Sequence, residues 1–194
     1  MIKLMILLKE LNIQPKDPIG QGIEQTVYPS KIKPGFVIKK LGGEDFEEKD
    51  EWTKDEWIKR IQTAQQHPEV FAKIDKVDFD KEYMVQEKLD EASLTRDLYE
   101  LNNYLIKNNL LNKDYWFLED ILDILVQFPD QINILDNTPY EKTLKPKLED
   151  FLKRLKTAGF GKDTGNIISD VRISNVGYDT AGKIKILDFH LGSY

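Results

Sequence analysis

Apolar and polar residues follow two periodicities along this chain, a strand-like one in the first half and a helical one in the second. In the first half, short runs of β-forming residues are separated by glycine and proline, which predicts an antiparallel meander. Apolar residues at helical spacing interrupt it once, before His67-Pro68. The expected elements are strands between residues 18 and 41 with a turn at Pro34-Gly35, a helix over 50–66, and strands near 72–79 and at 83–89.

In the second half, apolar residues recur three and four positions apart, which predicts amphipathic helices. The apolar faces are Leu94, Leu98, Leu101 and Leu105; Leu118, Ile121, Leu122 and Leu125, ended by Pro129; and Leu148, Phe151, Leu152 and Leu155, ended near Gly159. A loop is expected over 129–139, and the chain closes with Ile167-Ile168, a loop to Asn175 and a hairpin around residues 179–182. This order predicts an α+β fold with a β-rich lobe over 1–89 and a mainly helical lobe over 90–194.

The first eleven residues are the most apolar part of the N-terminal region. Lys3, Lys9 and Glu10 interrupt this stretch, so it is too short and too charged to span a bilayer, and it has no small-residue cleavage site. Its leucines recur at helical spacing, which predicts a short amphipathic helix that packs on the domain. We therefore expect no membrane association and a cytoplasmic protein.

The composition limits which catalytic groups, metal sites and partners the chain can have. The 194 residues are 40% hydrophobic and 32% charged, which suits a globular domain with a sizeable core. Cysteine is absent and there are only 2 histidines, so thiolate catalysis and Cys- or His-rich metal sites are excluded, and magnesium is the favoured metal. The formal net charge of -6 argues against nucleic acid as a partner.

Three short segments carry residues suited to binding phosphate and a hard cation. Gly20-Gln21-Gly22 lies between two expected strands, where glycine lets backbone N–H groups approach an anion, although an ordinary hairpin turn has the same pattern. Lys39 ends a run of β-formers. Asp170, Asn175 and Asp188 lie in the C-terminal loops, where their oxygens suit magnesium; as isolated residues they also fit cap and turn positions.

Together these segments resemble the motifs of protein kinases. Residues 20–27, GQGIEQTV, resemble the glycine-rich loop that ends in valine, with Gln25 in place of the third glycine. Phe36-Val37-Ile38-Lys39 resembles the strand that carries the phosphate-binding lysine, and residues 83–89 resemble the strand that leads into the hinge. The resemblance implies an ATP site formed by Gly20, Gln21, Gly22, Val27, Val37, Lys39, Gln86, Glu87 and Leu89, with backbone groups of Glu87 to Leu89 facing the adenine edge.

The C-terminal motifs occur in the same order as in that family. Asp170 to Asn175 match the D-x-x-x-x-N spacing of the catalytic loop, and Asp188-Phe189-His190 matches D-F-G with histidine in place of glycine. The resemblance implies that Asn175 and Asp188 bind Mg²⁺, that Asp170 receives the proton of an attacking hydroxyl, and that Arg172 neutralises charge near the γ-phosphate.

The helix partner of the lysine is the least defined part of the resemblance. In protein kinases a glutamate on the helix after this strand holds the lysine toward the phosphates. Glu56 is the expected partner, with Asp55 and Glu51 as alternatives on the same helix, and all three also fit solvated helix positions.

The sequence also differs from the protein-kinase pattern at positions that bear on regulation and on partner binding. Ile168 and Ser169 replace the histidine and arginine before the catalytic aspartate, and the sequence continues only four residues beyond His190. We therefore expect no activation-loop regulation, and a protein partner or self-association beside Asp170. The short format is similar to that of kinase-like proteins of bacteriophages and mobile elements, so a virion is an alternative location.

These observations predict an ATP-dependent phosphotransferase of protein-kinase-like fold that uses Mg-ATP and a hydroxyl acceptor. Two alternatives remain open at this point. One is a nucleotide-binding pseudokinase or structural module without turnover, such as a virion component, and the other is a kinase that acts on a small molecule.

Overall fold

The computed structural model describes residues 20–21, 25–30, 33–41, 51–80, 82–110, 121–161, 166–169 and 171–193. The chain divides into two compact units, Met1–Pro68 with Lys73–Lys88, and Glu69–Ala72 with Leu89–Tyr194. Residues 69–72 thus belong to the second unit, although the chain on both sides of them belongs to the first. The helix expected over residues 1–11 lies outside the described residues, and no helix within the described part is long and apolar enough to cross a membrane.

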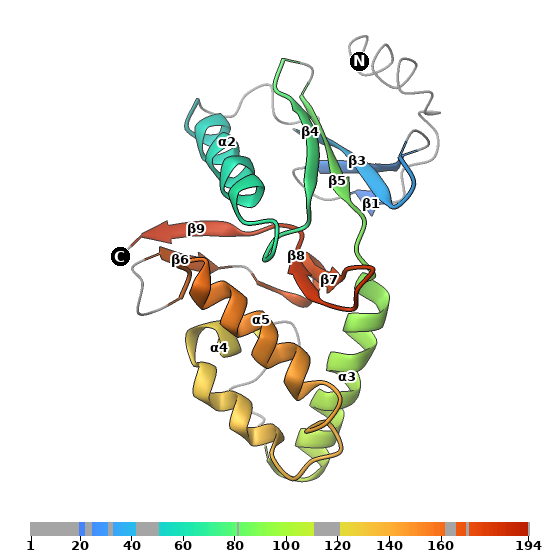
Figure 1. Ribbon diagram of the computed structural model, residues 1–194, viewed down its shortest axis with the longest axis vertical. Helices are drawn as coiled ribbons and strands as arrows, with labels where there is room; N and C mark the ends of the chain where they lie inside the picture. Colours follow the sequence, from blue (N-terminus) through green and yellow to red (C-terminus); the bar gives the residue numbers. More distant parts are fainter. Residues whose placement is uncertain are drawn as a thin grey trace. The chain divides into compact units, whose positions relative to one another are not determined.

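The first unit is an antiparallel sheet with one helix. The sheet has the strand order β1-β2-β3-β5-β4, and the α+β class expected from the sequence is confirmed. Figure 1 shows α2 beside β4. The elements are β1 (Gly20–Gln21), β2 (Gln25–Pro29), β3 (Phe36–Leu41), α2 (Glu51–Gln66), β4 (Ile74–Asp78) and β5 (Tyr83–Glu87).

The two faces of this sheet carry different apolar clusters. On one face, Tyr28, Ile38, Tyr83 and Val85 pack together with Phe36 beside them. On the other, Met84 packs with Trp57 and Ile61 of α2. Because neighbouring residues of a strand point to opposite faces, Met84 and Val85 of β5 belong to different clusters. Helix α2 therefore lies against the Met84 face.

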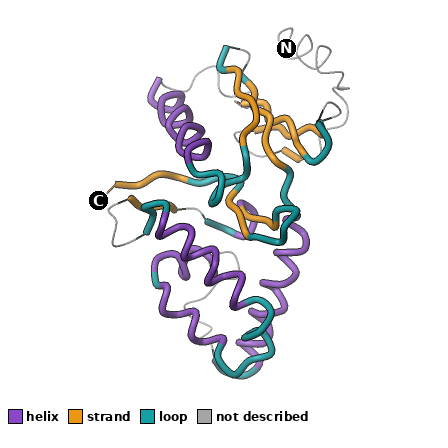
Figure 2. Tube along the Cα trace, in the orientation of Figure 1, coloured by secondary structure: helices purple, strands orange, loops and turns teal. Residues whose placement is uncertain are grey.

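The second unit contains the helices that follow α2 and two short strand pairs (Figure 2). Strand β6 pairs with β9, and β7 pairs with β8. The elements are α3 (Glu91–Lys107), α4 (Ile121–Gln127), the 3-10 helix η3 (Pro129–Leu135), α5 (Lys145–Thr157), β6 (Asn166–Ser169), the 3-10 turn η4 (Ile173–Asn175), β7 (Val176–Tyr178), β8 (Ile184–Ile186) and β9 (His190–Ser193).

The core of the second unit confirms the apolar faces predicted from the sequence. The leucines of α3 and the inward residues of α5 are buried, except that Leu152 is half-buried. These buried residues are Leu94, Leu98, Leu101 and Leu105 in α3 and Leu148, Phe151 and Leu155 in α5. Helix α5 ends before Gly159, whose φ of +83° is typical of a glycine that terminates a helix. Leu118 lies outside the described residues.

Two sequence-based expectations are wrong in this unit or at its edge, and one strand, β9, has no counterpart among the predicted elements. Residues 129–135 form the helix η3 rather than a loop, with Pro129 in its first turn, where the missing N–H has no helical acceptor. Strand β9 was not expected, because His190 to Ser193 has no alternating apolar pattern and depends on pairing with β6. The strand expected near residues 72–79 is shorter at its start, since Phe71 and Ala72 pair with β8 instead.

Strand β7 lies unusually close to the start of α3. Asp90 and Tyr178 exchange backbone hydrogen bonds of 2.8 and 3.2 Å, and the Tyr178 hydroxyl donates to Asp97 Oδ2 at 2.8 Å. Burial, and secondarily the hydrogen bond to Asp97, raises the pKa of Tyr178 well above its usual range. A Cβ atom on Gly177 would lie 2.7 Å from Leu89 Cβ and 3.1 Å from the nitrogen of Glu91. Only glycine therefore permits this approach.

Replacing Gly177 by alanine is expected to lower the free energy of unfolding by about 1–3 kcal/mol, because the added methyl group forces β7 and α3 apart. Urea denaturation measures this loss. Thr180→Ala, an exposed position in the adjoining hairpin turn, is the control and should change stability by less than about 0.5 kcal/mol. A Gly177→Ala protein as stable as the wild type would contradict the close approach.

Candidate nucleotide and metal sites

Four of the residues predicted to contact the nucleotide lie on one face of the first unit's sheet, whereas Glu87, which pairs with Phe36, belongs to the other face. Val27 pairs with Lys39, Val37 pairs with Gln86, and Lys39 also pairs with Met84. Directly paired residues of antiparallel strands, and alternate residues of one strand, have their side chains on the same face. Val27, Val37, Lys39 and Gln86 therefore share the Met84 face, against which α2 packs.

Lys39 is buried on this face, at 7% exposure. Lysine is rarely so buried unless acceptors or opposite charges surround its ammonium group. The neighbouring Lys40 pairs with Tyr83 and so lies on the opposite face. The sequence pattern by itself did not separate these two lysines, and the strand register does.

Helix α2 presents one of the three candidate carboxylates next to its packed face. Trp57, Arg60, Ile61 and Ala64 of this helix are buried. Glu56, directly before Trp57, is half-buried, whereas Asp55 is exposed. The side chain of Glu51 lies outside the described part of the chain. Of the two carboxylates that can be compared, Glu56 has the position suited to a lysine on the sheet face.

The glycine-rich segment is described in part. Gly20 of β1 pairs with Val27 of β2, so Gly20 lies over the same face as Lys39. Gln21 of the same strand pairs with Thr26. Gly22 lies outside the described residues.

The expected hinge residues use some of their backbone groups within the protein. The N–H of Glu87 donates to the carbonyl of Lys73 at 2.8 Å, and the N–H of Lys88 donates to the carbonyl of Gly35 at 2.9 Å. Glu87 Oε2 also accepts from the N–H of Lys73 at 3.0 Å. These two N–H groups are therefore committed to strand pairing and not to an adenine edge. Leu89 is buried and begins the next stretch of the second unit.

The second unit brings Asn175 and Asp188 together at one end of the β7–β8 hairpin. Val176 pairs with Ile186, and the pairing continues where the N–H of Leu187 donates to the carbonyl of Asn175 at 2.7 Å. Asp188 is the next residue, and its Oδ1 accepts from the N–H of Phe189 at 2.9 Å. An amide oxygen and a carboxylate thus come from adjoining chain segments.

This pair of residues fits the donor set of magnesium. Mg²⁺ usually keeps several waters and takes only one or two protein oxygens, the rest coming from substrate phosphates. Within the described residues, no group of three or more histidine, aspartate or glutamate side chains is arranged to hold a metal ion. The donors present therefore suit a phosphate-assisted magnesium site rather than an all-protein cage.

The structure describes the predicted catalytic loop, residues 170–175, except for its first residue. Arg172 is exposed at the start of η4, where its carbonyl accepts from the N–H of Asn175 at 2.9 Å. Asp170 lies outside the described residues. Its neighbours are Ser169, which pairs with His190 of β9, and Val171, which is fully buried.

Phe71 is a residue near the site that the sequence reasoning did not identify. Its ring stacks on Phe189 with centroids 4.3 Å apart and an interplanar angle of 27°, and both rings are buried. Ile186 accepts a hydrogen bond from Ala72 and donates one to Val70. The apolar run Val70-Phe71-Ala72 after His67-Pro68 is the signal in the sequence, but its last residue falls within the strand expected near residues 72–79.

Arg154 is a second residue near the site that the sequence motifs do not indicate. From α5 its guanidinium donates to the carbonyl of Glu69, to the carbonyl of Ile184 at 3.0 Å, and to Asp150 Oδ2 at 2.8 Å. One side chain thus connects α5, residues 69–72 and β8. The sequence shows the Asp150–Arg154 spacing typical of a helix pair, but the two carbonyl contacts depend on the tertiary fold.

Comparison with known proteins gives no match: no family model, curated protein or solved structure matches this chain. The resemblance to protein kinases therefore depends on the sequence motifs and on the geometry described above.

Replacing Phe71 by leucine is expected to lower the free energy of unfolding by about 1–2 kcal/mol and to speed amide exchange in residues 184–193, because the ring that supports Phe189 is lost. Urea denaturation and hydrogen exchange measure the two effects. Phe79→Leu is the matched control, since Phe79 packs edge-to-face on Trp57 in the first unit. Unchanged exchange in Phe71→Leu, or an equal increase in Phe79→Leu, would contradict this support.

Proposed function

We propose that the chain is an ATP-dependent phosphotransferase that resembles protein kinases in its architecture. The first unit binds the nucleotide through the face that carries Lys39. The second unit binds Mg²⁺ through Asn175 and Asp188 and directs the attacking hydroxyl through Asp170.

The observation that supports this proposal most strongly is the strand register of the first unit. Val27, Val37, Lys39 and Gln86 come from three strands and were selected by motif alone. Val37 and Lys39 share a face because they are two residues apart on β3, and the pairing with Val27 and Gln86 extends this face to the neighbouring strands. Their common face is also the one that α2 covers, where Glu56 can pair with Lys39.

The roles follow from the chemistry of the side chains. The Lys39 ammonium offers charge-assisted hydrogen bonds to phosphate oxygens, and Glu56 holds it in position. The backbone at Gly20 and Gly22 approaches the phosphates closely because no side chain intervenes. When bound, the magnesium ion neutralises charge that develops on the phosphate oxygens.

Asp170 is assigned to the acceptor hydroxyl. Its carboxylate accepts the hydroxyl proton as the hydroxyl oxygen forms a bond to the γ-phosphorus, and the bond to the ADP oxygen breaks. Arg172 is exposed at the start of η4, and in this proposal its guanidinium neutralises charge on the transferred group. A partner chain or a second copy beside Asp170 supplies the hydroxyl in this proposal.

Mg-ATP is expected to stabilise the protein, because a ligand that binds only the folded state shifts the unfolding equilibrium. At 100 times the dissociation constant the gain is about 2.7 kcal/mol, which thermal unfolding with and without magnesium detects. Lys39→Met should weaken binding by about 10–100-fold, as expected for a lost hydrogen bond to a charged phosphate.

Lys40→Met is the matched control for that variant, since it removes the adjacent lysine from the opposite face. It should bind Mg-ATP as the wild type does. Equal loss of affinity in both variants, or no thermal shift at millimolar Mg-ATP in the wild type, would refute the assignment of this face to the nucleotide.

Two substitutions should separate ATP binding from phosphoryl transfer: Asp188→Asn and Asp170→Asn. The first removes a metal-binding carboxylate and should weaken magnesium-dependent ATP binding. The second should leave binding intact and lower the rate of phosphoryl transfer by about 100-fold or more, because general-base assistance is lost. Radiolabel transfer from ATP and calorimetric titration of the same samples provide the two readouts.

Similar losses of ATP binding in both variants would contradict this division of roles. Tight magnesium-dependent ATP binding without any transfer in the wild type would instead identify a nucleotide-binding module without turnover.

A further inference from the structure

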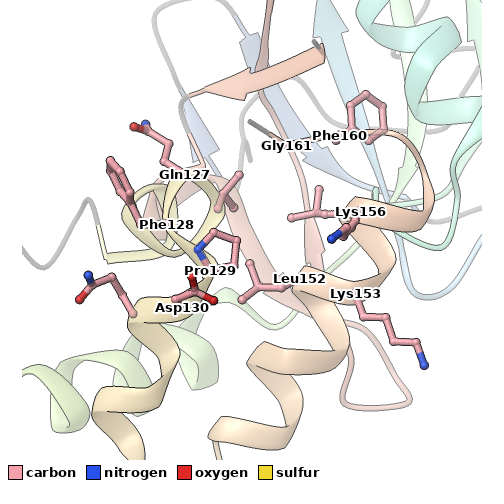
Figure 3. Close-up of a pocket in the computed structure, with 12 residues that line it drawn as sticks. Gln127, Phe128, Pro129, Asp130, Leu152, Lys153, Lys156, Phe160 and Gly161 are labelled. Atoms are coloured by element: carbon pink, nitrogen blue, oxygen red, sulfur yellow. The ribbon is translucent and has the colours of Figure 1, made fainter. Parts of the chain in front are cut away.

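A cavity of about 530 Å³ lies in the second unit between the end of α4, the start of η3 and the end of α5 (Figure 3). None of the residues assigned above to nucleotide, metal or catalysis lines it. Its lining residues are Val126, Gln127, Phe128, Pro129, Asp130, Gln131, Leu152, Lys153, Leu155, Lys156, Phe160 and Gly161.

The floor of this cavity is apolar. Val126, Leu155 and Phe160 are buried, and Leu152 of α5 is half-buried. In Figure 3, Leu152 points toward Pro129 and Asp130 of η3. The volume lies within the range of cavities that bind small organic molecules, which are typically apolar with a few polar groups at defined positions.

The polar side chains that line the cavity are two lysines, one aspartate and two glutamines. Lys153 and Lys156 lie one helical turn apart on α5 and line the cavity together with one carboxylate, Asp130. Figure 3 shows Lys156 beside the cavity, whereas Lys153 extends outward from the same helix. Among the other cations of α5, Lys145 pairs with Asp136 and Glu149, Arg154 pairs with Asp150, and Lys147 lies over the Tyr178 ring.

The two lysines and one aspartate give the rim of the cavity a net positive charge, although the protein as a whole has a formal net charge of -6. An anionic ligand is repelled by the protein as a whole, so its binding depends on local cations close to the site. The apolar floor contributes affinity in proportion to the hydrocarbon surface it covers. The floor and the rim therefore favour the same molecule, one with a hydrocarbon body and a single acidic head.

We propose that this cavity binds a free medium-chain carboxylic acid in its ionised form, with the chain on Leu152, Leu155 and Phe160, the carboxylate at Lys156, and Lys153 adding positive charge from the rim. This binding site is separate from the residues of the proposed phosphotransferase.

Calorimetric titration of the full chain with decanoate tests this proposal, with decanol as a probe of equal chain length and no charge. Decanoate should bind one site per chain and more tightly than decanol. The double variant Lys153→Gln/Lys156→Gln should weaken decanoate binding by about two- to fivefold per lysine and leave decanol binding unchanged. Lys142→Gln/Lys183→Gln, at exposed positions that do not line the cavity, is the matched control and should bind decanoate normally.

Leu152→Trp should abolish binding of both probes by filling the cavity. Gln131→Trp, at an exposed lining position, provides the same test if the first variant is unfolded by circular dichroism. Equal affinity for decanoate and decanol, equal loss in the two lysine variants, or binding that persists in a folded cavity-filling variant would overturn the proposal. Co-sedimentation with anionic phospholipid vesicles, without binding of free decanoate, would also overturn it.

Discussion

The attachment of residues 69–72 to strand β8 is the contact on which the C-terminal loops depend. Hydrogen bonds join Ile186 to Val70 and Ala72, and Phe71 stacks on Phe189. Asp188 lies between these two anchors, Ile186 and Phe189, so its backbone is held from both sides. Arg154 reinforces the same attachment from α5 by binding carbonyls of Glu69 and Ile184.

A second constraint acts in the first unit, where strand alternation divides neighbouring residues between two environments. Lys39 lies on the α2 face and Lys40 on the face of the Tyr28, Ile38, Tyr83 and Val85 cluster. The apolar packing of Met84 with Trp57 and Ile61 decides which face α2 covers. Hydrophobic packing that contains no catalytic residue thus determines which lysine can face a carboxylate of the helix.

Much of this architecture follows from the sequence, because periodicity reports burial directly. The leucines of α3 and the apolar face of α5 were predicted from their spacing, apart from the half-burial of Leu152. Strand β9 and helix η3 were not, since their short segments lack a periodic pattern and form through tertiary pairing or a proline start. For the site, motif spacing selected the residues, but only the register showed that Lys39 and Gln86 share a face. The roles of Phe71 and Arg154 depend on long-range contacts that spacing does not encode.

Lysine labelling with an acyl phosphate derivative of ATP tests the central claim most directly. Such a reagent transfers its acyl group to a lysine amine next to the bound phosphates, and mass spectrometry identifies the modified residue. The account predicts that Lys39 is acylated and that Mg-ATP in excess protects it, while Lys40, on the opposite face of the sheet, shows no nucleotide-dependent labelling. If Lys39 is not acylated, or if excess Mg-ATP does not reduce its acylation, the claim that this face binds the nucleotide would be contradicted.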